Sequence, residues 1–108
     1  MVEIQHNNDV VVVRMTGDFG QLEADILDEK LPPLAAQSPR VVVFDLSGVT
    51  LMASVALGEI LSLNRTVRKN GGKVCLAAPG QQVLSALRFT RIDDIVEICA
   101  SVDAAIGT

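Results

Sequence analysis

The fold of this chain is decided by residues 40–58, which read RVVVFDLSGVTLMASVALG. Val41 to Phe44 form a continuous run of β-branched and aromatic residues. Such a run is typical of a strand covered on both faces, because a half-exposed strand alternates apolar and polar residues. We therefore expect a central strand over residues 41–44, which leads through a short turn into a helix that begins at Ser54.

The apolar residues after this turn follow the period of a helix that packs by one face. They are spaced mostly by three or four positions and comprise Val55, Ile60, Leu61, Leu63 and Val67. Gly71 and Gly72 follow as a stop signal. The pattern predicts a helix from Ser54 to about Asn70.

Length and composition indicate one compact domain over residues 1–108. The chain is 49% hydrophobic and 20% charged, and a domain of this size buries roughly 60–70% of the surface that its unfolded form exposes. No apolar run approaches the ~18 residues of a membrane span, and the N-terminus does not resemble a signal peptide. We expect a cytoplasmic protein without membrane insertion. The net charge of −4 also argues against nucleic-acid binding, because it is a poor match to a polyphosphate.

Two strands and a helix are predicted before the central strand. Strands over residues 2–6 and 10–16 flank Asn7-Asn8-Asp9, whose residue types favour tight turns and so predict a β-hairpin. Residues 17–20, Gly-Asp-Phe-Gly, are predicted to break the second strand before a helix that begins near Gln21. Pro32 and Pro33 are predicted to end or kink that helix, because proline removes a backbone donor and clashes with the preceding turn.

Further elements alternate after the second helix. We predict a strand over residues 73–78, a third helix with Pro79 as its first residue, and a short last strand over residues 95–99. Ser101 can then cap a final helical turn. The order ββαβαβαβα predicts a single α/β domain with a mixed, mostly parallel sheet of about five strands and about four helices.

Catalytic patterns are missing from the sequence. It has no glycine-rich phosphate loop, no GxSxG motif and no clustered metal ligands in sequence. Cys75 and Cys99 lie in separate apolar segments without a CxxC pair, which favours buried free thiols over a disulfide or a metal site. His6 is interpreted as an edge-strand residue and Asp45 as a turn residue at a strand end. The sequence predicts a protein that is not an enzyme, with no catalytic residues, cofactor or metal.

The element order and the central stretch resemble the STAS family, the small domains of bacterial anti-sigma factor antagonists. The resemblance covers nearly the whole chain. Residues 45–49, Asp-Leu-Ser-Gly-Val, match the end of the family's central strand. The family then has Asp-Ser-Ser-Gly-Leu-Gly at the start of a helix, where this chain has Ala-Ser-Val-Ala-Leu-Gly at residues 53–58. Ala53 thus replaces the aspartate, and Arg91 occupies the place of a usual glycine after the third helix.

The resemblance implies a regulatory function for Ser54. In the family, the serine or threonine after the aspartate is phosphorylated by a partner kinase of the GHKL ATPase type, which is also the anti-sigma factor. The resemblance therefore implies an antagonist that sequesters such a kinase and is switched by phosphorylation at Ser54. From the residues alone, Ser54 is either a helix N-cap or a phosphoacceptor at the positive end of a helix, and both can hold at once.

The partner surface is predicted at one end of the sheet, where the loop after the second strand and the start of the second helix both follow strands. Met52 and Val55 are expected to be exposed apolar side chains at its centre. The predicted partner-binding residues are Gly17, Asp18, Phe19, Gly20, Met52, Ala53, Ser54, Val55 and Leu57. Two other functions remain open. The chain could be a scaffold module that binds other STAS proteins in a larger signalling assembly, or an accessory subunit of an ABC-type lipid transporter.

Overall fold

The computed structural model describes residues 1–107 as five strands and four helices, with one 3₁₀ turn. In chain order the elements are β1 (Val2–Asn7), β2 (Val10–Phe19), α1 (Gln21–Ala36), β3 (Val41–Met52), α2 (Ser54–Lys69), β4 (Lys73–Ala77), α3 (Gln81–Phe89), η1 (Ile92–Asp94), β5 (Glu97–Cys99) and α4 (Val102–Ile106). The strands form one sheet in the order β1-β2-β3-β4-β5. Only β1 and β2 are antiparallel, and the other neighbours are parallel. The predicted α/β fold is confirmed.

β3 is the central strand, and each residue from Val41 to Phe44 is 0% exposed. The strand is much longer than predicted, because it continues through Asp45 to Met52. β2 likewise runs to Phe19. The predicted turn after Asp45 and the predicted strand break at residues 17–20 are therefore wrong. Both strands continue because they pair with each other beyond the end of β4, with register shifts after Arg14 and after Gly17.

A close approach of the two strands explains the glycine in this extension. A Cβ atom at Gly48 would lie 2.7 Å from Cγ2 of Thr16, which is paired with Gly48 across the sheet. Only a residue without a side chain fits at this distance without a shift of its neighbour. Gly48 is thus part of the strand pairing, although the sequence suggested a turn.

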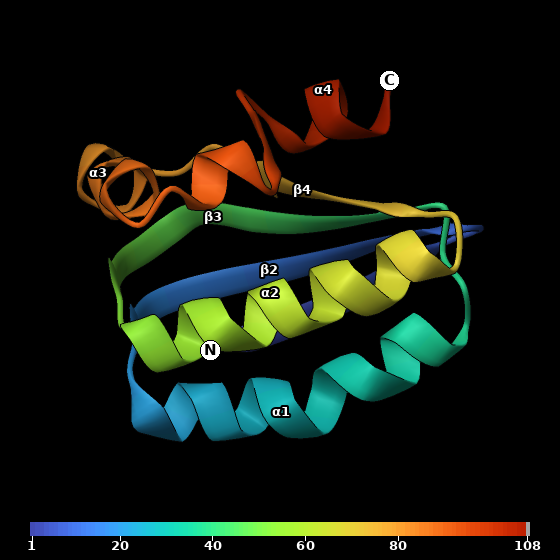
Figure 1. The fold of residues 1–108 in the computed structure, drawn as a ribbon, viewed down its shortest axis with the longest axis horizontal. Coiled ribbons are helices and arrows are strands. Elements are labelled where there is room, and N and C mark those ends of the chain that lie inside the picture. Colours follow the sequence, from blue (N-terminus) through green and yellow to red (C-terminus); the bar gives the residue numbers. More distant parts are fainter. Residues whose placement is uncertain (108) are drawn as a thin grey trace.

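The two faces of the sheet are covered unequally. Successive strand residues point to opposite faces, and α1 and α2 lie together on one side of the sheet (Figure 1). The large core forms there around residues such as Phe44, Leu27 and Ile60. The opposite face carries a smaller cluster that includes Val43, Cys75 and Ala105 of α4. Most of the hydrophobic stabilisation therefore comes from the side of α1 and α2, since it scales with the apolar area buried.

The boundaries of the helices correct several predictions. α1 does not end at Pro32 and Pro33 but passes through both to Ala36. Their missing N–H groups would have bonded the carbonyls of Asp28 and Glu29, and all four residues are exposed, so water can satisfy these carbonyls. α3 begins at Gln81, after Pro79.

The C-terminal part agrees more closely with the sequence. Ser101 caps α4 as predicted, because its Oγ accepts a hydrogen bond of 3.0 Å from the N–H of Ala104. β5 begins at Glu97 rather than at residue 95, since the 3₁₀ turn η1 precedes it. Arg91 adopts the left-handed conformation, with φ of +60°, which most residues enter at a cost of about 1 kcal/mol relative to glycine.

Candidate functional site

Two strand-to-helix junctions meet at the carboxyl end of the sheet. β2 leads into α1 at Gly20, and β3 leads into α2 at Ala53. The backbone N–H of Ala53 donates a hydrogen bond of 2.8 Å to the carbonyl of Phe19, which holds the junctions together. Both helices begin at this end of the molecule (Figure 1). The structure thus places residues 17–20 and 52–57 side by side, as the sequence led us to expect.

Three of the predicted partner-binding side chains are buried. Phe19, Met52 and Leu57 are 0%, 8% and 4% exposed and belong to the main core. The expectation that Met52 is exposed is therefore wrong. Because β3 extends to Met52, this residue pairs with Phe19 and packs beneath the surface. These side chains form the floor of the site and cannot themselves touch a partner.

Ser54 lies at the surface as the first residue of α2. The N-cap position is taken by Ala53, and no side chain among residues 1–107 caps the helix. The interpretation of Ser54 as the N-cap is therefore wrong by one position, since a capping oxygen has to come from the residue before the first helical turn. The carbonyl of Ala53 accepts the N–H groups of Ala56 and Leu57 at 3.0 and 3.2 Å.

The first turn of α2 keeps free hydrogen-bond donors. Within residues 1–107, the backbone N–H groups of Ser54 and Val55 have no hydrogen-bond partner. They lie at the positive end of a helix of 16 residues, where the helix dipole favours an anion. The hydroxyl of Ser54 is thus exposed beside two unused donors.

Three exposed apolar side chains lie on the elements that meet at this end of the sheet. Val55 is 44% exposed, and Leu51 at the end of β3 and Leu22 in the first turn of α1 are 57% and 69% exposed. Leu22 and Leu51 were missed in the sequence. Leu51 faces solvent because the pairing of β2 and β3 shifts register between Gly17 and Asp18, and a shift of this kind interrupts the alternation of a strand. We call Leu22, Leu51 and Val55 the apolar patch.

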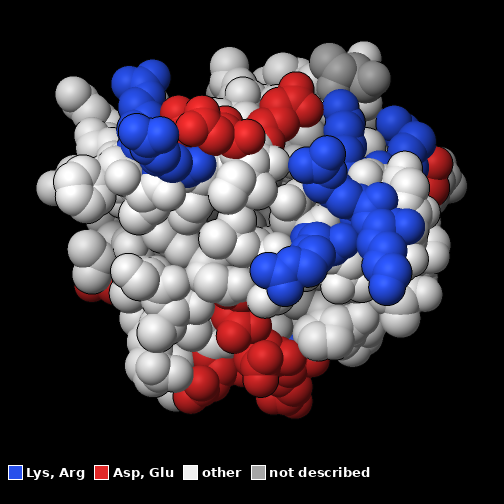
Figure 2. Space-filling view, viewed as in Figure 1, with Lys and Arg blue, Asp and Glu red and all other residues white. Residues whose placement is uncertain are grey.

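The charge around the apolar patch is low and negative. Residues 17–22 and 50–57 contain no lysine or arginine, and Asp18 is their only charged residue. Its carboxylate accepts a hydrogen bond from the hydroxyl of Thr50 across the strand pair. Charged side chains gather elsewhere, with acidic groups over α1 and basic groups over the later turns of α2 (Figure 2). A phosphate on Ser54 would therefore be received by N–H groups and not by basic side chains.

Asp45 lies earlier in β3 than Leu51 of the apolar patch. It is 8% exposed, and its Oδ2 lies 3.1 Å from Nε of Arg14. Its Oδ1 accepts hydrogen bonds from the N–H and hydroxyl of Ser47 at 3.1 and 2.8 Å. Burial alone would raise the pKa of this carboxyl, but the bonds from Ser47 and Arg14 outweigh it and lower the pKa. Asp45 is a mid-strand ion-pair residue, so its interpretation as a turn residue is wrong.

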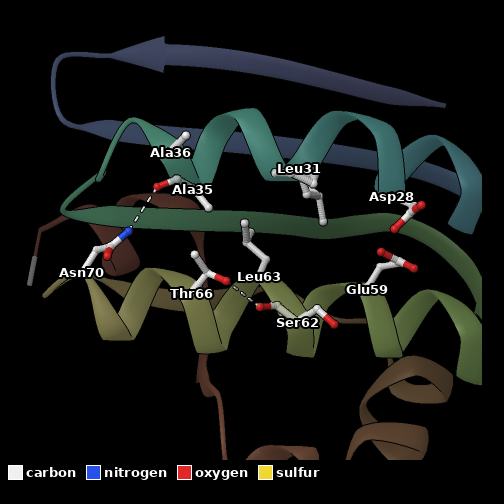
Figure 3. Close-up of a pocket in the computed structure, with 10 residues that line it drawn as sticks. Asp28, Leu31, Ala35, Ala36, Glu59, Ser62, Leu63, Thr66 and Asn70 are labelled. Carbon is white, nitrogen blue, oxygen red and sulfur yellow. Dashed lines mark hydrogen bonds between the residues drawn. The ribbon is translucent and has the colours of Figure 1, made fainter.

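The groove between α1 and α2 has a volume of about 320 Å³ and lies along the two helices (Figure 3). The carboxylates of Asp28 and Glu59 face each other across it (Figure 3). Burial of Glu59, followed by the neighbouring charges of Asp28 and Asp25, raises the pKa of Glu59. None of the predicted site residues lines this groove, so we interpret it as a seam between the helices.

The two cysteines lie near each other on β4 and β5, and no disulfide joins them. Cys75 is buried as predicted, whereas Cys99 is half-buried. Burial, followed by the neighbouring Cys99 and Glu97, raises the pKa of the Cys75 thiol to about 12. Cys75 therefore stays protonated at neutral pH and is a poor nucleophile by itself.

Comparison with known proteins identifies the family. The model of the STAS domain family matches residues 1–105. The chain belongs to the STAS domain family. This STAS domain is 28% identical over 105 residues to the anti-sigma-B factor antagonist of Bacillus subtilis (strain 168), an alignment that covers 97% of this chain and 95% of the relative.

Solved structures share the fold of this STAS domain. A crystal structure of an anti-sigma factor antagonist from Mycobacterium paratuberculosis is 23% identical, with a TM-score of 0.89 over 99% of this chain and 91% of that chain. The phosphorylated form of the Bacillus cell fate determinant SpoIIAA is 16% identical, with a TM-score of 0.79 over 99% and 97% of the two chains. In addition, no helix within residues 1–107 of this STAS domain is long and apolar enough to cross a membrane.

Proposed function

We propose that this STAS domain is an anti-sigma factor antagonist, which binds an anti-sigma factor that is also a serine kinase of the GHKL type. Phosphorylation of Ser54 by that kinase would release the complex. Both proteins would act in the cytoplasm. The observation that carries the proposal is the exposed hydroxyl of Ser54 beside two free N–H groups and the apolar patch. The name of the Bacillus subtilis relative supports the same function.

The apolar patch supplies the centre of the proposed interface. Apolar side chains that become fully buried carry most of the binding energy at such a centre, and a polar rim surrounds them. Leu22, Leu51 and Val55 come from three different elements, which the hydrogen bond between Ala53 and Phe19 holds together. The backbone at Gly17, Gly20 and Ala53 and the side chain of Asp18 would form the rim. This assignment replaces Met52 by Leu51, because only Leu51 is exposed.

A phosphate on Ser54 would act on the interface and not on the fold. The free N–H groups and the helix dipole stabilise an anion at this position. In the complex, however, a group with about −1.5 to −2 charges would be buried against the partner. Desolvation of such a charge costs several kcal/mol, and even ~3 kcal/mol weakens binding more than a hundredfold.

Ala53 is compatible with this switch. The hydrogen bonds of Ala53 come from its backbone, since its N–H donates to Phe19 and its carbonyl accepts from Ala56 and Leu57. The local backbone around Ser54 therefore forms without the aspartate of the family. What the kinase loses is one negative charge beside the hydroxyl, so we expect slower phosphorylation rather than a different site.

Phosphorylation and binding test the proposal together. The protein is incubated with the GHKL-type kinase and ATP, and mass spectrometry locates the phosphate. Ser54→Asp should bind the kinase more than a hundredfold more weakly, while Ser54→Ala binds like the wild type. Ser62→Asp is the matched control, because Ser62 is exposed on the same helix but about two turns from its start. An unmodified Ser54 with normal binding of Ser54→Asp would refute the switch.

A pulldown from the native cell separates the antagonist from the two other STAS functions. Recovery of a GHKL-type kinase supports the proposal. Recovery of other STAS proteins without a kinase would identify a scaffold module, and recovery of a transporter ATPase would identify an accessory transporter subunit. In all three cases the Val55→Asp variant should lose the partner if the apolar patch is the interface.

A further inference from the structure

Three potential metal ligands converge at the edge of the sheet, on the face opposite α1 and α2. Cys75 of β4 pairs with Glu97 of β5, and Ala77 pairs with Cys99. Because strand residues two apart point to the same face, all three side chains lie on the side that α4 covers. One ligand atom from each residue lies within 4.8 Å of the other two.

We propose that Cys75, Glu97 and Cys99 bind one Zn²⁺ ion, with both sulfurs and one carboxylate oxygen as ligands and water in the fourth position. Zinc prefers four ligands in a tetrahedron, with Zn–S distances of about 2.3 Å and Zn–O distances of about 2.0–2.2 Å. Two thiolates select zinc over hard cations such as Mg²⁺ and Ca²⁺, which favour oxygen ligands. This site lies apart from the apolar patch and does not depend on the proposed function.

The observed spacing agrees with this geometry. At the tetrahedral angle, those bond lengths separate a sulfur and an oxygen ligand by about 3.6 Å and two sulfurs by about 3.8 Å. In the absence of a metal, the Cys75 thiol donates a hydrogen bond of 3.6 Å to Oε2 of Glu97, and a zinc ion would replace its proton at the same separation. The pair is therefore already at the separation that a shared zinc ion requires, and the third ligand atom is within 4.8 Å of both.

The charge of the site is balanced when zinc is bound. Zinc binding would displace the thiol protons of Cys75 and Cys99 into solvent, because a metal-bound thiol is deprotonated. The two thiolates and one carboxylate then carry three negative charges, and Zn²⁺ neutralises two of them. Nζ of Lys73 lies 3.7 Å from Oε2 of Glu97 and supplies the remaining positive charge. A ligand set that is neutral as a whole avoids the penalty of an unpaired charge at a half-buried position.

The position of the ligands in the fold gives zinc a path to the site and predicts that zinc stabilises the edge of the sheet. Cys75 is fully buried beneath α4, whereas the Glu97 side chain is 53% exposed, so an ion can enter from the Glu97 side with its water ligand. β5 has only three residues and forms the edge of the sheet. A metal that joins β4 to β5 would hold this short strand in place, and binding to the folded state alone raises its stability.

Metal titrations of the whole chain test the proposal. Under reducing conditions, Zn²⁺ should bind with one ion per chain by calorimetry and raise the melting temperature. Co²⁺ used in place of zinc should give a thiolate-to-cobalt charge-transfer band and the intense visible bands of tetrahedral coordination. The affinity for both metals should fall at least tenfold in Cys99→Ser and in Glu97→Gln. Glu29→Gln, which removes an exposed carboxylate on α1, should bind like the wild type.

The variants are chosen so that loss of folding cannot imitate loss of the site. Cys75 is fully buried, so its replacement can unfold the protein, whereas Cys99 is half-buried and Glu97 exposed. Far-ultraviolet circular dichroism of both variants should match the wild type. The proposal is overturned if cobalt gives no charge-transfer band, or if Glu97→Gln binds zinc as tightly as the wild type. It is also overturned if the reduced chain binds no zinc and peroxide joins Cys75 to Cys99 in a disulfide.

Discussion

Residues 41–45 of β3 pair with β2 on one side and β4 on the other, whereas residues 47–52 run along β2 alone. The first part is buried throughout, and the second alternates irregularly between buried Val49 and Met52 and exposed Leu51. One strand thus serves two purposes. The part between β2 and β4 is buried in the core, and the part that pairs with β2 alone carries Leu51 of the apolar patch and leads to Ser54. The difference shows that a site can be built by extending a core strand past its neighbour.

The largest expected effect on stability lies in residues 41–45 of β3, between β2 and β4. Phe44 is 0% exposed in the main core, and Phe44→Ala should lower the free energy of unfolding by about 3–5 kcal/mol. Leu51→Ala removes a side chain that is 57% exposed in the same strand and should change it by less than about 0.5 kcal/mol. Urea unfolding measures both. Similar losses in the two variants would contradict the division of β3 into two parts.

Partner binding, in contrast to stability, should depend on the exposed residues near the start of α2. Val55→Asp places a charge within the apolar patch and should weaken binding to the anti-sigma kinase more than a hundredfold, through a penalty of about 3 kcal/mol. Ile95→Asp is a matched control, because Ile95 is 50% exposed and Val55 is 44% exposed. Circular dichroism should be unchanged in both. Normal binding of Val55→Asp would move the interface away from the start of α2.

The boundary between the two parts of β3 lies at Asp45, whose pKa is lowered from 3.8. A lowered pKa means that the carboxylate stabilises the folded state above pH 3.8 and that this stabilisation is lost as the pH falls through the lowered value. Asp45→Asn should therefore reduce the free energy of unfolding by about 1–3 kcal/mol at pH 7, because it disrupts a part-buried charged hydrogen-bond network. The difference from the wild type should shrink below pH 3.8.

A surface ion pair provides the control for this experiment. Nε of Arg40 lies 3.1 Å from Oδ2 of Asp9, and these side chains are 50% and 59% exposed. Asp9→Asn should change the free energy of unfolding by less than about 1 kcal/mol, since exposed pairs contribute little. A loss as large as that of Asp45→Asn would mean that burial does not distinguish the two pairs.

The smallest expected effect lies outside β3, in the seam between α1 and α2. The pKa of Glu59 is raised, first by burial and then by Asp28 and Asp25. The wild type therefore loses stability as the pH rises through this raised value, because the charged form is disfavoured in the folded state. Glu59→Gln should raise the melting temperature slightly at pH 7 and not below the pKa of Glu59. Thermal unfolding at pH 7 and below the pKa of Glu59 measures this. A lower melting temperature of the variant at pH 7 would contradict the unfavourable effect of the Glu59 charge.

The local elements were predictable because their signals lie within short stretches of sequence. The run from Val41 to Phe44 indicated a buried central strand, and the apolar spacing after Ser54 indicated where α2 begins. The turn residues between β1 and β2 and the cap at Ser101 depend on neighbouring backbone groups only. These predictions hold because periodicity and local hydrogen bonding are properties of adjacent residues.

The surface of the site was decided by contacts between distant segments. Pairing of β2 with β3 extended both strands, buried Met52 and exposed Leu51, and it placed Ala53 at the N-cap in front of Ser54. The register of β4 and β5 brought the side chains of Cys75, Glu97 and Cys99 together. By itself the sequence determined which segments form strands and helices, through their local pattern. Only the tertiary structure decided which side chains face solvent or one another, because register and burial depend on residues that are far apart in the chain.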